Sequence, residues 1–151
     1  MKSSRLATAL VATAVGLGVA SLPAISHAAP PDYRVAVTPK KNVGSSVKVK
    51  VSGLPRTVGV YVRLCAKTSG RPAASQCFGG TDRSGRWVIQ KYPYGARAAG
   101  TVNPAKGWFR LPVAQRFGSV NCARQTCVIS VRRDHRSGGD YSYDRSIRVR
   151  F

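Results

Sequence analysis

The sequence predicts an all-β domain, either a sandwich or a barrel, and three observations favour this fold class. Short apolar runs alternate with polar residues, turn-forming Gly, Pro and Ser separate the runs, and no segment has the periodicity of a three-turn helix. The length of 151 residues suits one domain. A hydrophobic content of 43% is enough to form a core despite a formal charge of +20.

Alternating apolar residues indicate the strands. Val47–Val51 places valines on one face and lysines on the other, and Val58–Leu64 repeats the pattern with its even-numbered residues directed inward. The remaining candidates are shorter. In chain order the expected segments, which make seven or eight strands, are 35–38, 47–51, 58–64, 86–90, 108–111, 119–122, 128–132 and 147–151.

Gly, Pro and Ser mark the connections between these strands. The clearest turns are 53–55, 69–72, 83–85 and 136–139. The segment Lys91–Gly107 has no apolar periodicity and contains Tyr92, Tyr94 and Arg97 among its residues. We expect this segment to form a long basic loop.

The first 28 residues have the composition of a signal peptide. Lys2 and Arg5 precede an apolar run from Leu6 to Ala20, and 26–28 places small residues where a signal peptidase reads them. The run is shorter than the roughly 20 residues that span a membrane. We expect a signal peptide over residues 1–28, a mature domain over residues 29–151 without a transmembrane segment, and secretion to the extracellular space or cell envelope. Loss of Lys2 and Arg5 would lower the charge from +20 to +18.

The mature part contains all four cysteines, Cys65, Cys77, Cys122 and Cys127. An even number in an exported chain predicts two disulfides, for which three pairings are open. Proximity in the sequence favours Cys65–Cys77 and Cys122–Cys127, since each pair would close one hairpin or loop. A zinc site is the competing use of four cysteines, but the paired C-x₂-C spacing of structural sites is absent. We therefore expect no metal.

The composition argues against catalysis. With no Glu and only five Asp, the chain has few carboxylates for glycoside hydrolysis or two-metal phosphoryl transfer. The mature part has one histidine, His135, beside Asp134, and no G-x-S-x-G sequence. A hydrolase using His135 is the remaining enzymatic hypothesis, but a solvated loop histidine explains the residue better. The sequence predicts a protein that is not an enzyme.

The excess of 25 basic over 5 acidic residues predicts contact with a polyanion. Aromatic residues such as Trp108 and Tyr141 lie among the cations, which is typical of surfaces that stack on bases or sugars. Nucleic acid, phosphate-rich wall polymers and anionic lipid would all be bound through charge, and the sequence does not choose among them. The polyanion-binding candidates are Lys48, Lys50, Arg63, Arg133, Arg136, Arg148 and Arg150.

Two groups of residues resemble one known family. The first consists of Val35-Ala36-Val37-Thr38-Pro39, Val49-Lys50-Val51-Ser52-Gly53-Leu54-Pro55, Val60-Tyr61-Val62 and Cys65-Ala66. The second is Gly118-Ser119-Val120-Asn121-Cys122 with Cys127 five positions later. In this order the residues resemble the neocarzinostatin family of secreted enediyne-antibiotic apoproteins, over most of residues 34–133.

The resemblance implies an immunoglobulin-like, seven-stranded β-sandwich with an appended two-stranded ribbon. It also implies the disulfides Cys65–Cys77 and Cys122–Cys127. The family binds a reactive chromophore in a cleft between sandwich and ribbon, so the resemblance implies a non-covalently bound small molecule, no other cofactor, and a DNA-binding, antibacterial role.

The positions that the resemblance assigns to the cleft differ in chemistry from those of the family. Lys67 stands where the family has an aromatic residue, and Arg132 stands where it has a small polar one. We therefore expect the ligand to be more polar or anionic than the family's chromophores. The protein itself is expected to be a monomer. The alternative is a cell-envelope or extracellular protein that binds wall polymers, anionic lipid or nucleic acid and has lost chromophore binding. The predicted ligand-binding residues are Leu64, Lys67, Phe78, Phe117, Val128 and Arg132.

Overall fold

The structure is a computed structural model that describes residues 29–79, 84–95, 97, 99–134 and 140–151. The expected signal peptide, His135 and Arg136 lie outside the described residues. Within these ranges, no helix has both the length and the apolar character needed to cross a membrane.

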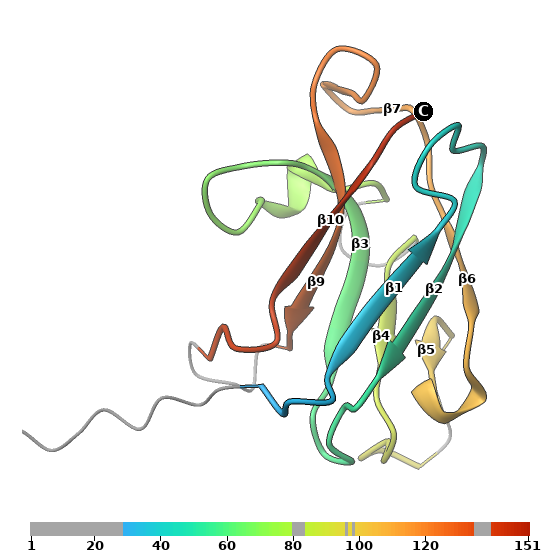
Figure 1. The fold of residues 1–151 in the computed structure, drawn as a ribbon, viewed down its shortest axis with the longest axis vertical. Coiled ribbons are helices and arrows are strands. Elements are labelled where there is room, and N and C mark those ends of the chain that lie inside the picture. The colour runs from blue at the N-terminus through green and yellow to red at the C-terminus, as the bar shows by residue number, and fades with distance from the viewer. Residues whose placement is uncertain (1–28, 80–83, 96, 98, 135–139) are drawn as a thin grey trace, which may run out of the picture.

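Two sheets pack face to face as a sandwich (Figure 1). The three-stranded sheet has the order β1-β2-β6, so that β1 and β6 form its edges; its strands are β1 (Arg34–Thr38), β2 (Ser46–Ser52) and β6 (Phe109–Pro112). The five-stranded sheet has the order β10-β9-β3-β4-β5, with edges at β10 and β5. Its strands are β3 (Val60–Ala66), β4 (Arg86–Val88), β5 (Thr101–Val102), β9 (Cys127–Arg133) and β10 (Arg145–Val149).

A short ribbon and two helical turns complete the described fold. The ribbon pairs β7 (Arg116–Phe117) with β8 (Val120–Asn121), and the 3₁₀ turns are η1 (Ala74–Gln76) and η2 (Pro104–Lys106). The predicted all-β sandwich with a two-stranded ribbon and two disulfides is confirmed. The two sheets together hold one strand more than the seven that the resemblance implies for the sandwich, because β5 adds to β4.

The prediction of a structureless loop over Lys91–Gly107 is wrong for its second half. β5 pairs in parallel with β4, and the amide of Ile89 donates to the carbonyl oxygen of Val102 at 3.0 Å. η2 follows directly, capped by the Asn103 side chain, which accepts from the amide of Ala105 at 3.0 Å. A two-residue strand is too short to produce a detectable alternation, so the sequence pattern does not reveal it.

The strand pleat separates the core from the cations. In β2 the valines 47, 49 and 51 are buried, whereas Lys48 and Lys50 are exposed. In β3 the even-numbered residues 60, 62 and 64 are buried, as the alternation predicts. Each buried Val or Leu side chain stabilises the fold by about 1.5–3 kcal/mol. Because a slip of one residue would turn the lysines of β2 into the core, this pattern fixes the register.

Both predicted disulfides are present, Cys65–Cys77 and Cys122–Cys127. The first ties the segment that follows β3 back onto the end of that strand, and the second closes the turn between β8 and β9. They join residues 12 and 5 positions apart. Each bond restricts the unfolded chain and contributes on the order of 2–3 kcal/mol of stability.

Candidate ligand-binding cleft

A cleft of about 290 Å³ lies on the outer face of the five-stranded sheet. Its floor comes from β3 and β9, where Tyr61 is opposite Arg132 and Arg63 is opposite Ser130. These four residues alternate with core residues such as Val62 and Val131, so the pleat directs them away from the core. The floor is therefore rigid and carries two cations and one aromatic ring.

The wall of the cleft is the segment that the Cys65–Cys77 disulfide closes. Arg71, Pro72, Ala74 and the disulfide line this side. Arg132 links wall and floor, since its Nη2 donates to the carbonyl oxygen of Pro72 and its Nε donates to Ser130 Oγ at 3.3 Å. The disulfide and Arg132 together hold the wall over the sheet.

A second hollow of about 540 Å³ adjoins the first on the side of β10. Arg71, Pro72, Ser130 and Arg132 line both hollows, so the two form one continuous depression. Arg71 is fixed at their boundary by Asp144, whose carboxylate accepts from its Nε at 2.6 Å and its Nη2 at 2.8 Å. The guanidinium of Arg71 also lies over the Tyr141 ring, 4.1 Å from its centroid.

Positive charge dominates the first hollow. Four arginines, Arg63, Arg71, Arg132 and Arg133, line it, and its lining includes no carboxylate. Arg71 pairs with Asp144, and Arg133 pairs with Asp140. The hydrogen bonds that Arg132 donates go to the neutral oxygens of Pro72 and Ser130.

The surroundings of Arg132 disfavour its charge. Burial lowers the pKa of its guanidinium, the positive charges of Arg71 and Arg63 lower it further, and Asp144 opposes the change. A cation in this position gains stability when an anion enters the cleft, because the anion replaces lost hydration and offsets the repulsion.

The structure does not gather the six predicted ligand residues around this cleft. Arg132 lines it, and Val128 lies on the same sheet face opposite Cys65 but is buried. Lys67 is exposed beyond the end of β3, where its amide donates to the Thr126 carbonyl oxygen. The set is therefore divided, and of the six predicted residues only Arg132 lines this cleft.

The other three predicted residues belong to the core side of the sheet. Leu64 is 1% exposed, while the rings of Phe78 and Phe117 contact each other at a tilt, 5.7 Å apart between centroids, and pack against the core. Successive residues of a strand point to opposite faces, so Leu64 cannot share the outer face with Cys65. Residues chosen only because they align with the family's cleft positions can lie on either face of the sheet.

Sequence reasoning missed Tyr61, Arg71 and Ser130 as members of the cleft. Tyr61 and Ser130 could have been found, because both fall on the outward-facing positions of predicted strands. Arg71 could not, since its position depends on the path of the segment between the two cysteines. That path is set by long-range contacts such as the pair with Asp144.

The predicted polyanion-binding residues lie on separate surfaces. Arg63 and Arg133 are half-buried in the cleft, where Arg133 donates to Asp140 and lies 5.2 Å from the centroid of the Tyr143 ring. Lys48 and Lys50 are exposed on the three-stranded sheet. Arg148 and Arg150 are exposed at β10 and just beyond its end, and Arg136 lies outside the described residues. The expected basic surface is thus at least two surfaces on different sheets.

The fold and the cleft define a β-sandwich with two disulfides and an arginine-lined depression on one sheet. No family model matches the chain, and no curated protein matches it. The chain is similar to a solved structure named macromomycin, with 21% sequence identity and a TM-score of 0.48, covering 79% of this chain and 98% of that chain. Macromomycin is an apoprotein of the neocarzinostatin family, which the sequence motifs resemble. The fold assignment rests on the strands and disulfides of the structure itself, and the similarity transfers no ligand or activity.

Proposed function

We propose that the protein is a secreted, non-enzymatic binding protein that holds a small anionic ligand with a planar part in the arginine-lined cleft. The observation that supports this most directly is the convergence of four arginines on one hollow, with Arg132 bonded to neutral oxygens. Arginine binds carboxylate, sulfonate or phosphate groups through paired hydrogen bonds. Tyr61 adds aromatic surface to the lining beside these cations, where its ring stacks with Trp87 and lies 5.5 Å from the guanidinium carbon of Arg63.

The size and chemistry of the depression favour a polar ligand over an apolar one. The two adjoining hollows of about 290 and 540 Å³ fall in the range of small-molecule sites. An apolar polyene would remove water from the guanidinium groups without replacing their hydrogen bonds, which is unfavourable. The neocarzinostatin resemblance supports a carrier role, and a DNA-directed antibacterial effect would then belong to the carried molecule.

Secretion is part of the same proposal. The leader over residues 1–28 has signal-peptide composition, and the two disulfides suit an oxidising compartment. The mature protein would then comprise residues 29–151. N-terminal sequencing of the exported product tests this, and a first residue other than Ala29 would contradict it.

A pair of fluorescent probes tests the ligand class. Anilinonaphthalene sulfonate carries an anion beside its rings, whereas phenylnaphthylamine has the same ring types without the anion. We expect the sulfonate to bind and the neutral probe to bind weakly. Arg132→Gln should reduce sulfonate affinity about 10- to 150-fold, as expected for the loss of a hydrogen bond to a charged group.

Two variants with the same change in charge serve as controls. Lys67→Gln lies outside the lining of the cleft, and Lys48→Gln lies on the other sheet. Both should keep sulfonate affinity within about twofold, which corresponds to less than 0.5 kcal/mol. Equal losses in all three variants, or equal binding of the two probes, would contradict the proposal. Native mass spectrometry of the exported protein then shows whether a ligand is carried.

The second candidate function is binding of an extracellular polyanion without a small-molecule ligand. The excess of 25 basic over 5 acidic residues and the exposure of Lys48 and Lys50 away from the cleft favour it. If six phosphates are contacted, affinity for long-chain polyphosphate should fall about 10³-fold between 50 and 200 mM salt. An affinity that does not change with salt would exclude this function.

A further inference from the structure

The outer face of the three-stranded sheet carries cations at neighbouring positions of adjacent strands. Lys48 of β2 is opposite Arg110 of β6, and Lys50 follows two residues along β2. All three side chains are exposed, while Val49, between Lys48 and Lys50, is buried. Adjacent strands lie about 4.8 Å apart, so the sheet holds like charges at close range. Such an arrangement is destabilising alone and is relieved by an anionic partner.

An exposed tryptophan lies beside these cations. Trp108 immediately precedes β6 and is 48% exposed. A shallow hollow of about 490 Å³ runs along it, lined by Thr38, Lys48, Trp108, Phe109 and Arg110, with no carboxylate among the lining residues. The hollow therefore combines aromatic surface with two cations.

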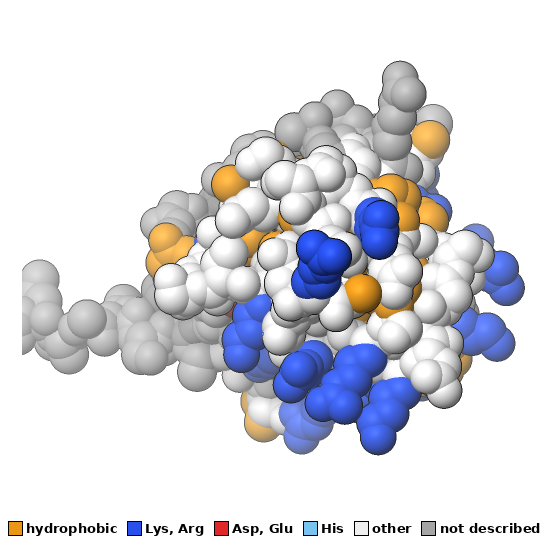
Figure 2. All heavy atoms as spheres, turned by 90° about the horizontal axis from the view of Figure 1, so that it is seen from above, with side chains coloured by type: hydrophobic (Ala, Val, Ile, Leu, Met, Phe, Trp, Pro, Cys, Tyr) orange, Lys and Arg blue, Asp and Glu red, His pale blue; other side chains and the backbone are white. Residues whose placement is uncertain are grey.

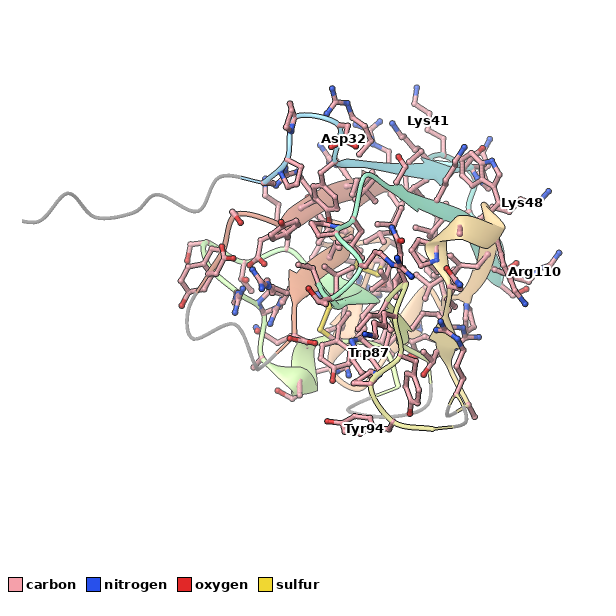
Figure 3. All side chains as sticks on the ribbon, turned by 90° about the horizontal axis from the view of Figure 1, so that it is seen from below. Asp32, Lys41, Lys48, Trp87, Tyr94 and Arg110 are labelled. Carbon is pink, nitrogen blue, oxygen red and sulfur yellow. A yellow bond between two sulfur atoms is a disulfide. The ribbon has the colours of Figure 1, made fainter. Side chains whose placement is uncertain are left out.

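This face belongs to a different sheet from the cleft, whose floor is formed by β3 and β9 of the five-stranded sheet. Figure 2 shows Lys and Arg side chains gathered along one side of the molecule. In Figure 3, Lys41, Lys48 and Arg110 point outward on one side, whereas Trp87 and Tyr94 lie on another. Because the core separates the two sheets, a group bound in the hollow beside Trp108 does not contact Arg132.

We propose that Lys48, Lys50, Trp108 and Arg110, here called the basic-aromatic face, bind single-stranded nucleic acid. The cations contact successive phosphates, and one base stacks on Trp108 in the hollow. This inference rests on the second candidate function, polyanion binding, for which it names the polyanion and the binding site. It does not depend on the cleft.

The shape of the face favours a single strand over the other polyanions. Bases of a single strand are free to stack on an aromatic side chain, whereas those of a duplex are already stacked. A wall polymer of phosphodiesters offers no planar ring to fill the hollow. Membrane binding requires a broad protruding apolar area, whereas here the exposed Trp108 and the half-buried Phe109 line a hollow between cations. Since the contacts are to phosphate and to a base face, no sequence preference is expected.

Two labelled oligonucleotides test the inference by fluorescence anisotropy. One is an oligothymidylate, and the other is an abasic strand with the same number of phosphates. The oligothymidylate should bind more tightly. Trp108→Ala should weaken oligothymidylate binding roughly 5- to 150-fold, the range for one stacked base, and leave abasic binding unchanged.

A matched pair of double variants tests the place of binding. Lys48→Gln with Arg110→Gln should weaken both strands and reduce the slope of log affinity against log salt by about 1.4, for two lost phosphate contacts. Arg116→Gln with Arg124→Gln removes the same charge from the ribbon and the turn after it, where both arginines are exposed. This control should retain the slope. Circular dichroism of each variant confirms that the fold is kept.

The outcomes separate this inference from both candidate functions. Equal affinity of the wild-type protein for the oligothymidylate and the abasic strand would overturn the inference that a base stacks on Trp108. If both strands then bind in a salt-dependent way, the second candidate function, polyanion binding, is still supported. If Arg132→Gln abolishes binding while the Lys48 and Arg110 substitutions have no effect, the nucleic acid binds in the cleft and the inference is wrong. Trp108-dependent binding to phosphatidylglycerol vesicles in preference to the oligothymidylate would assign the face to a membrane and overturn the inference.

Discussion

Arg132→Gln is expected to reduce sulfonate affinity about 10- to 150-fold while lowering the free energy of unfolding by no more than about 2 kcal/mol. The substitution loses hydrogen bonds to Pro72 and Ser130, each contributing about 1 kcal/mol. The lowered pKa of Arg132 shows that its charge is less stable in the folded than in the unfolded chain, and the neutral amide removes that penalty. The two effects have opposite signs, so they partly cancel. The guanidinium of Arg132 is protonated in both the folded and the unfolded chain near neutral pH, so the effect of Arg132→Gln on the free energy of unfolding should not depend on pH in this range.

Arg133→Gln is the matched comparison, because Arg133 also lines the cleft but is paired within the protein. It donates to Asp140, and its guanidinium lies over the Tyr143 ring. Its side chain is 24% exposed and that of Asp140 is 12% exposed, so solvent weakens the pair only in part. We expect Arg133→Gln to destabilise the protein by about 1–2 kcal/mol.

Urea unfolding followed by circular dichroism measures both variants. A shift in midpoint with an unchanged slope gives the change in stability. Anilinonaphthalene sulfonate at 100 times its dissociation constant should stabilise the wild-type protein by about 2.7 kcal/mol, and Arg132→Gln much less. A loss of more than about 2 kcal/mol in Arg132→Gln without ligand would refute the reasoning, since Arg132 would then be a structural link between wall and floor.

Three further predictions concern stability. Gly53 has a φ of 67°, and a Cβ there would meet the carbonyl group of Asp32, so Gly53→Ala should destabilise by more than about 2 kcal/mol. Gly44→Ala, where a Cβ has no neighbour within 4 Å, should change stability by less than about 1 kcal/mol in the same urea assay. Leu64→Ala should lower the free energy of unfolding by about 2–5 kcal/mol because the side chain is 1% exposed, and an effect below 1 kcal/mol would contradict its core position. Burial alone would raise the pKa of Asp140, but donors from the following turn and its arginine partner lower it overall. Stability should therefore be lost as the pH falls below about 4, and Asp140→Asn should flatten that part of a melting-temperature profile against pH.

The sandwich could be predicted because β2 and most of β3 alternate buried with less buried residues, and this pattern is visible before any contact is known. The alternation ends at Leu64, since Cys65 and Ala66 are also buried. The disulfide pairing followed from proximity in the sequence and from the resemblance. The bounds of the last strand were less accurate: β10 begins and ends two residues before the predicted 147–151. Arg150 instead bonds through its backbone to the loop between β1 and β2.

The cleft could be predicted only in part. Arg132, one of the six residues predicted to bind ligand, lines this cleft, whereas Leu64 points into the core, as the alternation over 58–64 indicates. The predicted set came from family positions, which do not distinguish the two faces of a strand. The ion pair of Arg71 with Asp144 joins residues 73 positions apart. Contacts over such separations depend on the folded chain, and a single sequence does not specify them.

The edges of the two sheets also affect how copies of the protein meet. An exposed edge strand offers unpaired backbone groups to another chain, which promotes aggregation unless charge prevents it. Here three edges carry exposed arginines, Arg34 on β1, Arg110 on β6 and Arg148 on β10, and the fourth edge is the two-residue β5. Two molecules approaching edge to edge therefore bring like charges together, which favours colloidal stability at low ionic strength. Added salt screens this repulsion, so self-association should be sought first in concentrated salt or beside a polyanion.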